Sequence, residues 1–491
     1  MAQEGEILDL DQVTIDPSCV MRVSASFAFE HAVMPICTIN GDFVVAMANP
    51  ADARTIAQLR RGLGAPVVVY PANADQLARH LTRIYGSIQA VQGDMRLDGA
   101  VSTVEYLLRT AYLRHASDIH LDPDPAGIRV RFRVDGELEE VMRIPPELQP
   151  SVTSRLKVMG EVKLDERRAP QDGAFSWQIP VAASGDEGVS LDVRLATLPG
   201  RYGEKVTLRL LETDSKLYTM DMLGMDEETR VSFEEVLANP YGLVLLTGPT
   251  GSGKTTTLYA AIQYLLQKRP INVLTVENPI EYEIPGIFQA EVDAVDKVNF
   301  SKALRSILRH DPDVIMIGEM RDHESLDTAA KAALTGHLVL STLHTNDAVN
   351  AVTRMVNMGL ERHIVAATLR LSVAQRLVRR LCRYCREPYA LTGGEAAMFG
   401  MPSLEGQTVY RSHGCVWCAG RGLKGRLGLF ELFRPDVSIS SAIADGAPET
   451  ELRRLHVACG NRTLLDDGWL KCQCGETATR EVLRVAMRAR P

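Results

Sequence analysis

The segment from Gly248 to Thr255 has the composition and spacing of a phosphate-binding loop. It reads GPTGSGKT, fills every fixed position of the pattern G-x-x-x-x-G-K-[ST], and follows an apolar run at 243–246 that predicts a strand. Glycines let backbone N–H groups close around a phosphate, a lysine adds positive charge, and a hydroxyl can bind Mg²⁺. The alternative is a glycine-rich turn without a ligand. We expect nucleotide binding by Gly248, Pro249, Thr250, Gly251, Ser252, Gly253, Lys254, Thr255 and Thr256, with magnesium on the Thr255 hydroxyl.

Two glutamates follow later apolar runs of the same kind. Glu277 comes after the run at 271–276, and Glu319 comes after the run at 314–317. A nucleoside triphosphatase needs one carboxylate to orient or deprotonate water and another to fix Mg²⁺ through its water shell. Both glutamates are therefore candidate catalytic residues. The alternative for either one is a helix cap or a simple ion pair with Arg321.

Two histidines frame the fourth apolar run, at 338–340. His337 precedes this run and His344 follows it closely. A histidine beside a phosphate site can sense the γ-phosphate and pass its loss to the next element. Both are candidates for that role, although a lone histidine is more often a hydrogen-bonded part of the structure.

The composition of the chain limits the class of protein to which these residues belong. The chain has 491 residues, enough for about three domains, and its 45% hydrophobic and 24% charged residues are typical of folded proteins. A net charge of −8 is weak evidence against nucleic-acid binding over the whole surface. The start shows no basic and apolar signal segment, and no stretch reaches the roughly 18 apolar residues that cross a bilayer. We expect a cytosolic chain.

Four of the nine cysteines form two pairs with metal-ligand spacing. Cys382 and Cys385 make one C-x-x-C pair, Cys415 and Cys418 make another, and 29 residues separate the pairs. In a reducing compartment, such pairs predict a closed, tetrahedral zinc site with a structural role. Redox chemistry or four unrelated thiols are the alternatives. His413 is a less favoured ligand because four sulfurs already complete the site.

The predicted secondary structure changes character along the chain. Apolar runs at 243–246, 271–276, 314–317 and 338–340 predict a parallel sheet that is covered on both faces and binds ligands at the carboxyl ends of its strands. The other expected elements are strands within 33–48 and at 65–69, a helix that begins at 52–55, helices at 72–85 and 97–115, a strand at 128–134 that turns at Asp135-Gly136, strands at 189–195 and 205–211 around a turn at Pro199-Gly200, and a helix at 370–386.

The expected helix at 370–386 is strongly basic. It contains Arg376, Arg379, Arg380 and Arg383. In isolation it is compatible with binding to nucleic acid or anionic lipid. A solvated helix face or a contact between subunits is the favoured interpretation.

These segments resemble the type II secretion and type IV pilus assembly ATPases. Four segments are similar to the four signature motifs of that family. They are GPTGSGKT at 248–255, TVENPIEY at 275–282, LRSILRHDPD at 304–313 continuing to GEMRD at 318–322, and TGHLVLSTLHTND at 335–347. Earlier, SDIH at 117–120, RFRVDG at 131–136 and ERRAPQDG at 166–173 resemble the domain that precedes the ATPase core in this family. The resemblance covers most of the chain.

The resemblance implies an α/β fold with a RecA-like P-loop NTPase domain, preceding α+β domains and a small tetracysteine zinc lobe. The domains it predicts are an N-terminal α/β docking domain at 1–93, an arginine-bearing α+β domain at 94–215, the RecA-like ATPase core at 216–381, the zinc lobe at 382–435 and a C-terminal helical region at 436–491. It implies ATP, Mg²⁺ and Zn²⁺ as ligands.

The resemblance also implies roles for single residues. Lys254 and Thr255 correspond to the phosphate and Mg²⁺ residues, Glu277 and Glu319 to the acidic catalytic pair, and His337 and His344 to the histidine box. Arg194 and Arg209 match positions from which this family brings arginines onto the nucleotide when two domains close. Planar guanidinium groups suit a developing γ-phosphate charge. The alternative for each arginine is a solvated strand face.

The implied function is that of a homohexameric motor that hydrolyses ATP to power pseudopilus assembly and export by a type II secretion system. The zinc lobe favours an assembly motor over a retraction motor, and type IV pilus extension is the alternative within the family. The resemblance places the chain in the cytoplasm, attached peripherally to inner-membrane platform proteins through its N-terminal domain. No direct nucleic-acid partner is expected.

Two departures from the family pattern keep other classes open. Asn278 replaces an aspartate that is usual after the glutamate, and Ala174 replaces a residue that is commonly basic. Asn278 leaves room for a scaffold that binds ATP without hydrolysing it. A RecA-like DNA translocase is the other rival, which the acidic net charge and the 5% aromatic content disfavour.

Overall fold

The computed structural model describes most of the chain, namely residues 7–20, 22–85, 99–178, 190–212, 218–292 and 300–486. These residues form two compact units. The first unit contains the residues before 216 together with Cys382–Arg386 and Ser412–Lys424, and the second contains the rest. The predicted boundaries at 93/94 and 215/216 lie outside the described residues, and the five-domain division stays a prediction.

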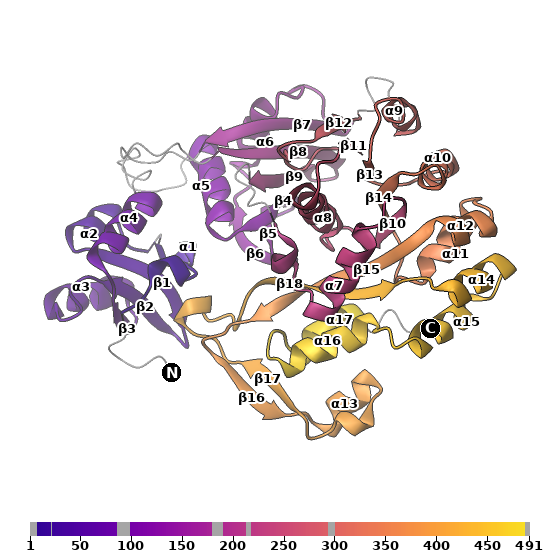
Figure 1. Cartoon of the computed structure of the whole chain (residues 1–491). Helices are drawn as coiled ribbons and strands as arrows, with labels where there is room; N and C mark the ends of the chain where they lie inside the picture. The colour runs from indigo at the N-terminus through magenta and orange to yellow at the C-terminus, as the bar shows by residue number, and fades with distance from the viewer. Residues whose placement is uncertain are drawn as a thin grey trace. The chain divides into compact units, whose positions relative to one another are not determined.

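The first unit begins with a three-stranded sheet in the order β1-β2-β3 (Figure 1). Strands β1 and β2 are antiparallel, and β2 and β3 are parallel. The Asp52 carboxylate accepts hydrogen bonds from the backbone N–H groups of Arg54 and Thr55, so α3 begins where the sequence predicted. The elements are η1 (Leu10–Gln12), α1 (Pro17–Val20), α2 (Ala25–Glu30), β1 (Val33–Ile39), β2 (Asp42–Met47), α3 (Ala53–Leu63), β3 (Val67–Pro71) and α4 (Ala74–Tyr85).

A six-stranded antiparallel sheet follows, in the order β6-β5-β4-β9-β8-β7. Asp135 and Gly136 have φ angles of 49° and 88°, which suit a two-residue hairpin turn and confirm the turn predicted there. The expected helix at 97–115 is α5, and Leu97 lies outside the described residues. The elements are α5 (Ala100–Leu113), β4 (Ala116–Asp124), β5 (Gly127–Val134), β6 (Glu137–Ile144), α6 (Gln149–Met159), β7 (Gln171–Gln178), β8 (Ser190–Gly200) and β9 (Gly203–Glu212).

The turn between β8 and β9 lies two residues later than predicted. Pro199 and Gly200 belong to β8, and Gly200 pairs with Gly203. The chain therefore reverses at residues 201–202, and Gly203 adopts a φ of 133° that favours glycine. Val189, the expected start of the first of these strands, lies outside the described residues.

The second unit contains a seven-stranded sheet in the order β12-β11-β13-β14-β10-β15-β18. The pairs β10–β14, β10–β15, β11–β12, β11–β13 and β13–β14 are parallel. Leu243 and Leu245 of β10 belong to one apolar core, whereas Val244 and Leu246 belong to another, so the sheet is covered on both faces as predicted. The strands are β10 (Gly242–Thr247), β11 (Val273–Glu277), β12 (Phe288–Glu291), β13 (Val314–Ile317), β14 (Leu338–Leu343), β15 (Leu369–Leu381) and β18 (Leu423–Phe433).

The prediction of a basic helix at 370–386 is wrong, because residues 369–381 form strand β15. This strand lies between β10 and β18, and most of its side chains are buried. Arg376 is only 8% exposed, whereas Arg380 faces solvent. The helix prediction failed because a buried interior strand can hold charged side chains when backbone oxygens pair with them.

Helices pack on both faces of the second unit's sheet (Figure 1). The last four helices come after β18 in the chain. No helix among the described residues is both long enough and apolar enough to span a membrane. The remaining elements are η2 (Met220–Leu223), α7 (Glu227–Leu237), α8 (Lys254–Lys268), α9 (Phe300–Ile307), α10 (His323–Leu334), α11 (Asn350–Asn357), α12 (Arg362–Thr368), β16 (Arg386–Ala390), α13 (Gly393–Phe399), η3 (Pro402–Leu404), β17 (Thr408–Ser412), η4 (Val416–Cys418), α14 (Val437–Asp445), α15 (Glu449–Ala458), α16 (Leu464–Gln473) and α17 (Thr479–Ala486).

Candidate functional site

The phosphate-binding loop connects β10 to α8 and packs tightly against β15. Gly248 has a φ of 149°, and a Cβ atom there would lie 2.6 Å from the carbonyl oxygen of Gln375. Gly253 has a φ of 86°, and a Cβ atom there would lie 2.8 Å from the side-chain nitrogen of Gln375. At these distances any side chain would have to displace its neighbour on β15. The two glycines therefore let the loop lie against β15 while its N–H groups and the N-terminus of α8 stay available to an anion.

Lys254 is buried inside this loop. Its Nζ donates hydrogen bonds to the carbonyl oxygens of Gly248 at 2.8 Å and Pro249 at 3.1 Å. Burial and the positive charge of Arg376 lower the pKa of Lys254 to about 8, and the negative charge of Glu319 opposes that shift. A buried cation next to a second cation is costly, so a phosphate anion at this point would be strongly stabilised.

Arg376 holds together two segments that flank the loop. Its Nη1 donates to the carbonyl oxygen of Gln375 at 2.9 Å, and its Nη2 donates to the carbonyl oxygen of Asn346. Gln375 in turn accepts a hydrogen bond from the Thr257 hydroxyl at 2.9 Å, which ties β15 to α8. Burial lowers the pKa of Arg376. Arg376 thus supplies positive charge near Lys254 from a strand that sequence patterns did not connect with the site.

Glu277 ends β11 and is 2% exposed. Its Oε1 accepts hydrogen bonds from the Thr275 hydroxyl at 2.6 Å and from the Gln289 amide at 3.1 Å. Its Oε2 accepts a hydrogen bond from the Tyr259 hydroxyl. Three donors therefore surround a carboxylate that would be costly to bury without them.

Glu319 lies just after β13 and is more accessible, with a side chain that is 19% exposed. It forms an ion pair with Arg321, the alternative considered from sequence, and one of its oxygens lies 3.8 Å from His344 Nε2. Its charge also acts on Lys254. The ion pair with Arg321 therefore does not remove Glu319 from the loop's surroundings.

The two histidines lie at opposite ends of β14. Strands β10 and β14 are parallel, and the phosphate-binding loop follows the end of β10, so His344 lies at the loop's edge of the sheet and His337 at the other edge. Burial and the charge of Lys254 lower the pKa of His344. His337 Nδ1 lies 3.0 Å from the carbonyl oxygen of Ala332. Within this chain, the structure brings His344 but not His337 to the loop.

The two arginines lie in the six-stranded sheet of the first unit. Arg194 of β8 pairs directly with Arg209 of β9, and Arg209 pairs with Asp118 of β4. Arg209 Nε donates to Asp118 Oδ1 at 3.0 Å. Residues that pair in this way lie in one row across a face of the sheet. Arg194 and Arg209 therefore share a face.

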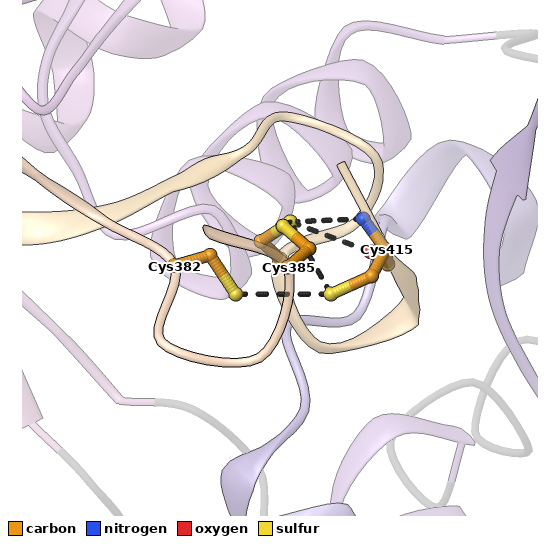
Figure 2. A group of neighbouring side chains, drawn as sticks. Cys382, Cys385 and Cys415 are labelled. Atoms are coloured by element: carbon orange, nitrogen blue, oxygen red, sulfur yellow. Dashed lines mark hydrogen bonds between the residues drawn. The ribbon is translucent and has the colours of Figure 1, made fainter. Parts of the chain in front are cut away.

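The four predicted zinc ligands come together in the first unit. Their sulfur atoms all lie within 4.8 Å of one another, and Figure 2 shows the side chains of Cys382, Cys385 and Cys415 gathered in one place. The distance between sulfurs is 3.7 Å for Cys382 and Cys415 and 3.9 Å for Cys385 and Cys418. Four sulfurs at the usual Zn–S distance of about 2.3 Å in a tetrahedron lie about 3.8 Å apart. The donor set and its spacing therefore fit a structural zinc ion.

This cysteine group also completes an apolar core. Val416 and Trp417 are buried in the same cluster as the side chains of β1 and β2. The backbone N–H of Thr14 donates to the carbonyl oxygen of Trp417 at 3.2 Å, and Lys424 Nζ donates to the carbonyl oxygen of Gln12 at 2.6 Å. The turns that carry the cysteines are thus packed into the three-stranded sheet of the first unit.

Two family patterns cover almost the whole chain. Residues 98–484 match the type II/IV secretion system proteins, and residues 5–91 match the MshEN domain. The chain belongs to the type II/IV secretion system protein family. The family expected from the sequence is confirmed, and so is the α/β P-loop fold.

Relatives of this type II/IV secretion system protein are named for two systems, type IV pilus assembly and type II secretion. The type IV pilus assembly ATPase PilB of Myxococcus xanthus is 37% identical, over 97% of this chain and 88% of that protein. The type II secretion system protein E of Pseudomonas aeruginosa is 43% identical, over 78% of this chain and 75% of that protein. The crystal structure of the pilus retraction motor PilT with bound ADP has a TM-score of 0.52 and 26% identity, over 77% of this chain and 95% of that one. The chain is thus an ATPase of the secretion and pilus assembly family.

The structure gives physical reasons for both departures of this type II/IV secretion system protein from its family pattern. The Asn278 amide donates to the carbonyl oxygen of Val292 at 2.6 Å, a bond that an ionised aspartate could not make. Ala174 pairs with Arg194 across β7 and β8, so a basic residue there would oppose a like charge. Each departure thus suits its local surroundings.

Sequence patterns missed several residues of this family member that contact Glu277 or the phosphate-binding loop. Tyr259, Gln289 and Gln375 were not singled out, and Arg376 was assigned to a helix. Tyr259 carried a usable signal, because it follows Thr255 by four residues and so shares its face of α8. Gln289 and Gln375 lie on strands far along the chain and had no such signal.

Proposed function

We propose that this ATPase works as a homohexamer, hydrolysing MgATP to power pseudopilus assembly and protein export by a type II secretion system. The observation that carries the proposal is the grouping of Lys254, Glu319 and His344 at one edge of the parallel sheet. Glu319 lies 3.8 Å from His344, and its charge acts on the buried Lys254. A phosphate-binding cation beside an accessible carboxylate is the arrangement that hydrolysis of a nucleoside triphosphate requires.

In this proposal each residue near the loop has a separate task. Lys254 and the N–H groups at the start of α8 hold the phosphates, and the Thr255 hydroxyl holds magnesium, which spreads the phosphate charge when bound. Glu319 accepts the proton of the attacking water because it is the more accessible carboxylate. Glu277 contributes a fixed negative charge. His344, beside Glu319, responds to loss of the γ-phosphate.

The other predicted residues act at a distance from the loop or support the structure. Arg194 and Arg209 stabilise the charge that develops on the γ-phosphate, as their positions in the family pattern imply. His337 has a structural role, which its 3.0 Å contact with the Ala332 carbonyl oxygen supports. Cys382, Cys385, Cys415 and Cys418 hold a structural zinc ion.

In this proposal, the partner that binds the N-terminal region determines where in the cell the ATPase is located. The MshEN match at residues 5–91 supports a docking role for this region. We infer that it attaches the chain peripherally to a platform protein of the inner membrane, on the cytoplasmic side. No nucleic acid is a direct partner in this proposal.

ATP hydrolysis by the full-length chain, measured in its hexameric fraction, tests the proposed function. We expect Glu319→Gln to lower kcat on the order of a hundredfold or more, because it removes the proton acceptor. Glu324→Gln is the matched control, since that glutamate is exposed on α10 and should leave kcat unchanged. Single-stranded and duplex DNA should have no effect. Strong stimulation by DNA would favour a translocase, and tight ATP binding with no turnover would favour a scaffold.

Type IV pilus extension is a second candidate because the PilB relative aligns over 97% of this chain. The two candidates differ in the platform and pilin subunits that the motor engages. Binding of the full-length chain to purified platform proteins of each system, with turnover measured in each complex, separates them. Stimulation by the pilus platform alone would overturn the type II assignment.

A further inference from the structure

Tyr259 links the phosphate-binding helix to the acidic segment after β11. It lies on α8, four residues after Thr255 and therefore on the same face of the helix. The residue is fully buried, at 0% exposure. Its hydroxyl donates to Glu277 Oε2 and accepts a hydrogen bond from the backbone N–H of Glu281 at 3.3 Å. One hydroxyl thus connects the helix, the carboxylate and the loop that follows.

Gln289 holds the other oxygen of the same carboxylate from the edge strand β12. Its Nε2 donates to Glu277 Oε1 at 3.1 Å, and its Oε1 accepts from the backbone N–H of Ile284 at 2.7 Å. The same Nε2 lies 3.3 Å from the carbonyl oxygen of Tyr282. These bonds fix the orientation of the amide, so its N–H points to the glutamate.

The ring of Tyr259 adds a second constraint on the loop. It packs edge-on against the ring of Tyr282, with centroids 4.5 Å apart and an angle of 80° between the planes. Such an edge-to-face contact is favourable and directional. Burial, with the negative Glu277 next to it, raises the pKa of Tyr259, so the hydroxyl stays protonated and remains a donor.

We propose that Tyr259 and Gln289 are positioning residues for ATP hydrolysis, which hold the Glu277 carboxylate in register with Thr255 and the phosphate end of α8. This assignment rests on the proposed function, because it concerns the hydrolytic site. Since Tyr259 and Thr255 belong to one rigid helix, any movement of α8 on nucleotide binding moves the Glu277 carboxylate with it. Neither residue touches the reacting atoms in this assignment, and both act through Glu277.

Tyr259→Phe in the full-length chain tests the assignment by removing one hydroxyl. We expect kcat to fall roughly tenfold or more, because a hydrogen bond to a charged group is lost, whereas KM for ATP stays within about twofold. A general weakening of the fold would instead change KM and the melting temperature as well. Tyr264→Phe is the matched control, since this tyrosine lies on the same helix and its hydroxyl faces Glu234, so its kcat should be that of the wild type.

A double-mutant cycle with Glu277→Gln separates positioning from other effects. If Tyr259 acts through Glu277, the double variant loses no more kcat than Glu277→Gln alone, as measured by single-turnover phosphate release. Should Tyr259→Phe fold poorly, Gln289→Leu leaves α8 intact and must show the same loss and the same lack of additivity. Wild-type kcat in Tyr259→Phe, or a fully additive loss, overturns the assignment alone. If the wild-type chain does not hydrolyse ATP, or if its turnover does not require Lys254, the proposed function is overturned and the assignment falls with it.

Discussion

Arg209 donates from Nε to the carboxylate of Asp118 at 3.0 Å, and Asp118 is a buried residue. The same carboxylate lies 3.8 Å from Arg133 Nε. Arg194 stands opposite Arg209 on the next strand, and in the part of the chain that the structure describes it makes no ion pair. The two arginines expected to serve the nucleotide therefore differ in what they do for the fold.

This difference predicts that the two arginines can be told apart by stability. Arg194→Gln should lower kcat about tenfold or more without lowering the free energy of unfolding, because no ion pair is lost. Arg209→Gln should lower kcat and also lower the free energy of unfolding by about 1 kcal/mol, since Asp118 loses a charged donor. Denaturant unfolding and steady-state kinetics on both variants check this. Arg201→Gln, at the exposed turn, serves as a control, and equal stability of all three would contradict the prediction.

The lowered pKa of Lys254, about 8, predicts that nucleotide affinity depends on pH. Below pH 8 the lysine already carries its proton in the free chain, whereas above pH 8 it must take one up when phosphate binds. The affinity for ATP should therefore weaken as pH rises above about 8, by up to about tenfold per pH unit until the pKa of the bound state is reached. Calorimetric titration in buffers of different ionisation enthalpy should show proton uptake on binding at pH 9.

Arg376 supplies the variant that tests the cause of this pH dependence. Because its positive charge lowers the pKa of Lys254, Arg376→Gln should move the loss of affinity to higher pH. Arg380→Gln is the control, since this arginine lies on the same strand but is exposed. An unchanged pH profile in Arg376→Gln would show that the charge of Arg376 contributes little to the lowered pKa of Lys254.

Local patterns carried most of the fold prediction. Continuous apolar runs predicted β10, β11, β13 and β14, because a strand buried on both faces has no polar side to alternate with. The register of a hairpin depends on pairing across strands, so the turn at residues 201–202 could not be fixed from the Pro199-Gly200 pair. β15 was mistaken for a helix because Arg376 pairs with the carbonyl oxygen of Asn346, 30 residues earlier in the chain.

The same distinction applies to the site. The phosphate-binding loop and the cysteine pairs are set by short spacings, so the sequence could indicate them directly. His337 was linked with His344 because both border β14, but a strand of six residues places its ends about 20 Å apart. Gln289 contacts Glu277 only through the pairing of β11 with β12, which no local pattern encodes.

The packing of the cysteine group into the first unit predicts that metal loss loosens the N-terminal sheet. Cys415→Ser should reduce bound zinc, and because Val416 and Trp417 belong to the same apolar core as β1, hydrogen exchange in β1 should become faster. Trp417 stacks on Tyr384 with ring centroids 4.3 Å apart and is only 8% exposed, so its fluorescence should shift to longer wavelength.

Cys459→Ser provides the matched control for this experiment. That cysteine is exposed and is not part of the tetracysteine group, so zinc content, exchange in β1 and fluorescence should all stay as in the wild type. A Cys415→Ser chain that loses its zinc but keeps slow exchange in β1 would show that the sheet does not need the metal.

Replacing Arg453 by glutamine should lower the free energy of unfolding much more than the same replacement of its neighbour Arg454. Arg453 Nη2 donates to Asp347 Oδ2 at 2.6 Å, and the Asp347 side chain is 2% exposed. Arg453→Gln should lower the free energy of unfolding by about 2–3 kcal/mol, because it leaves a buried carboxylate without its cation. Arg454 is 67% exposed and pairs with Glu451 on the helix surface, so Arg454→Gln should cost about 0.5 kcal/mol or less.

Since Asp347 ends the segment that begins at His344, Arg453→Gln should also lower kcat, whereas Arg454→Gln should not. Chemical denaturation and turnover of the two variants decide the matter, and similar costs would mean that Asp347 is stabilised mainly by Asn350, which donates to both of its oxygens.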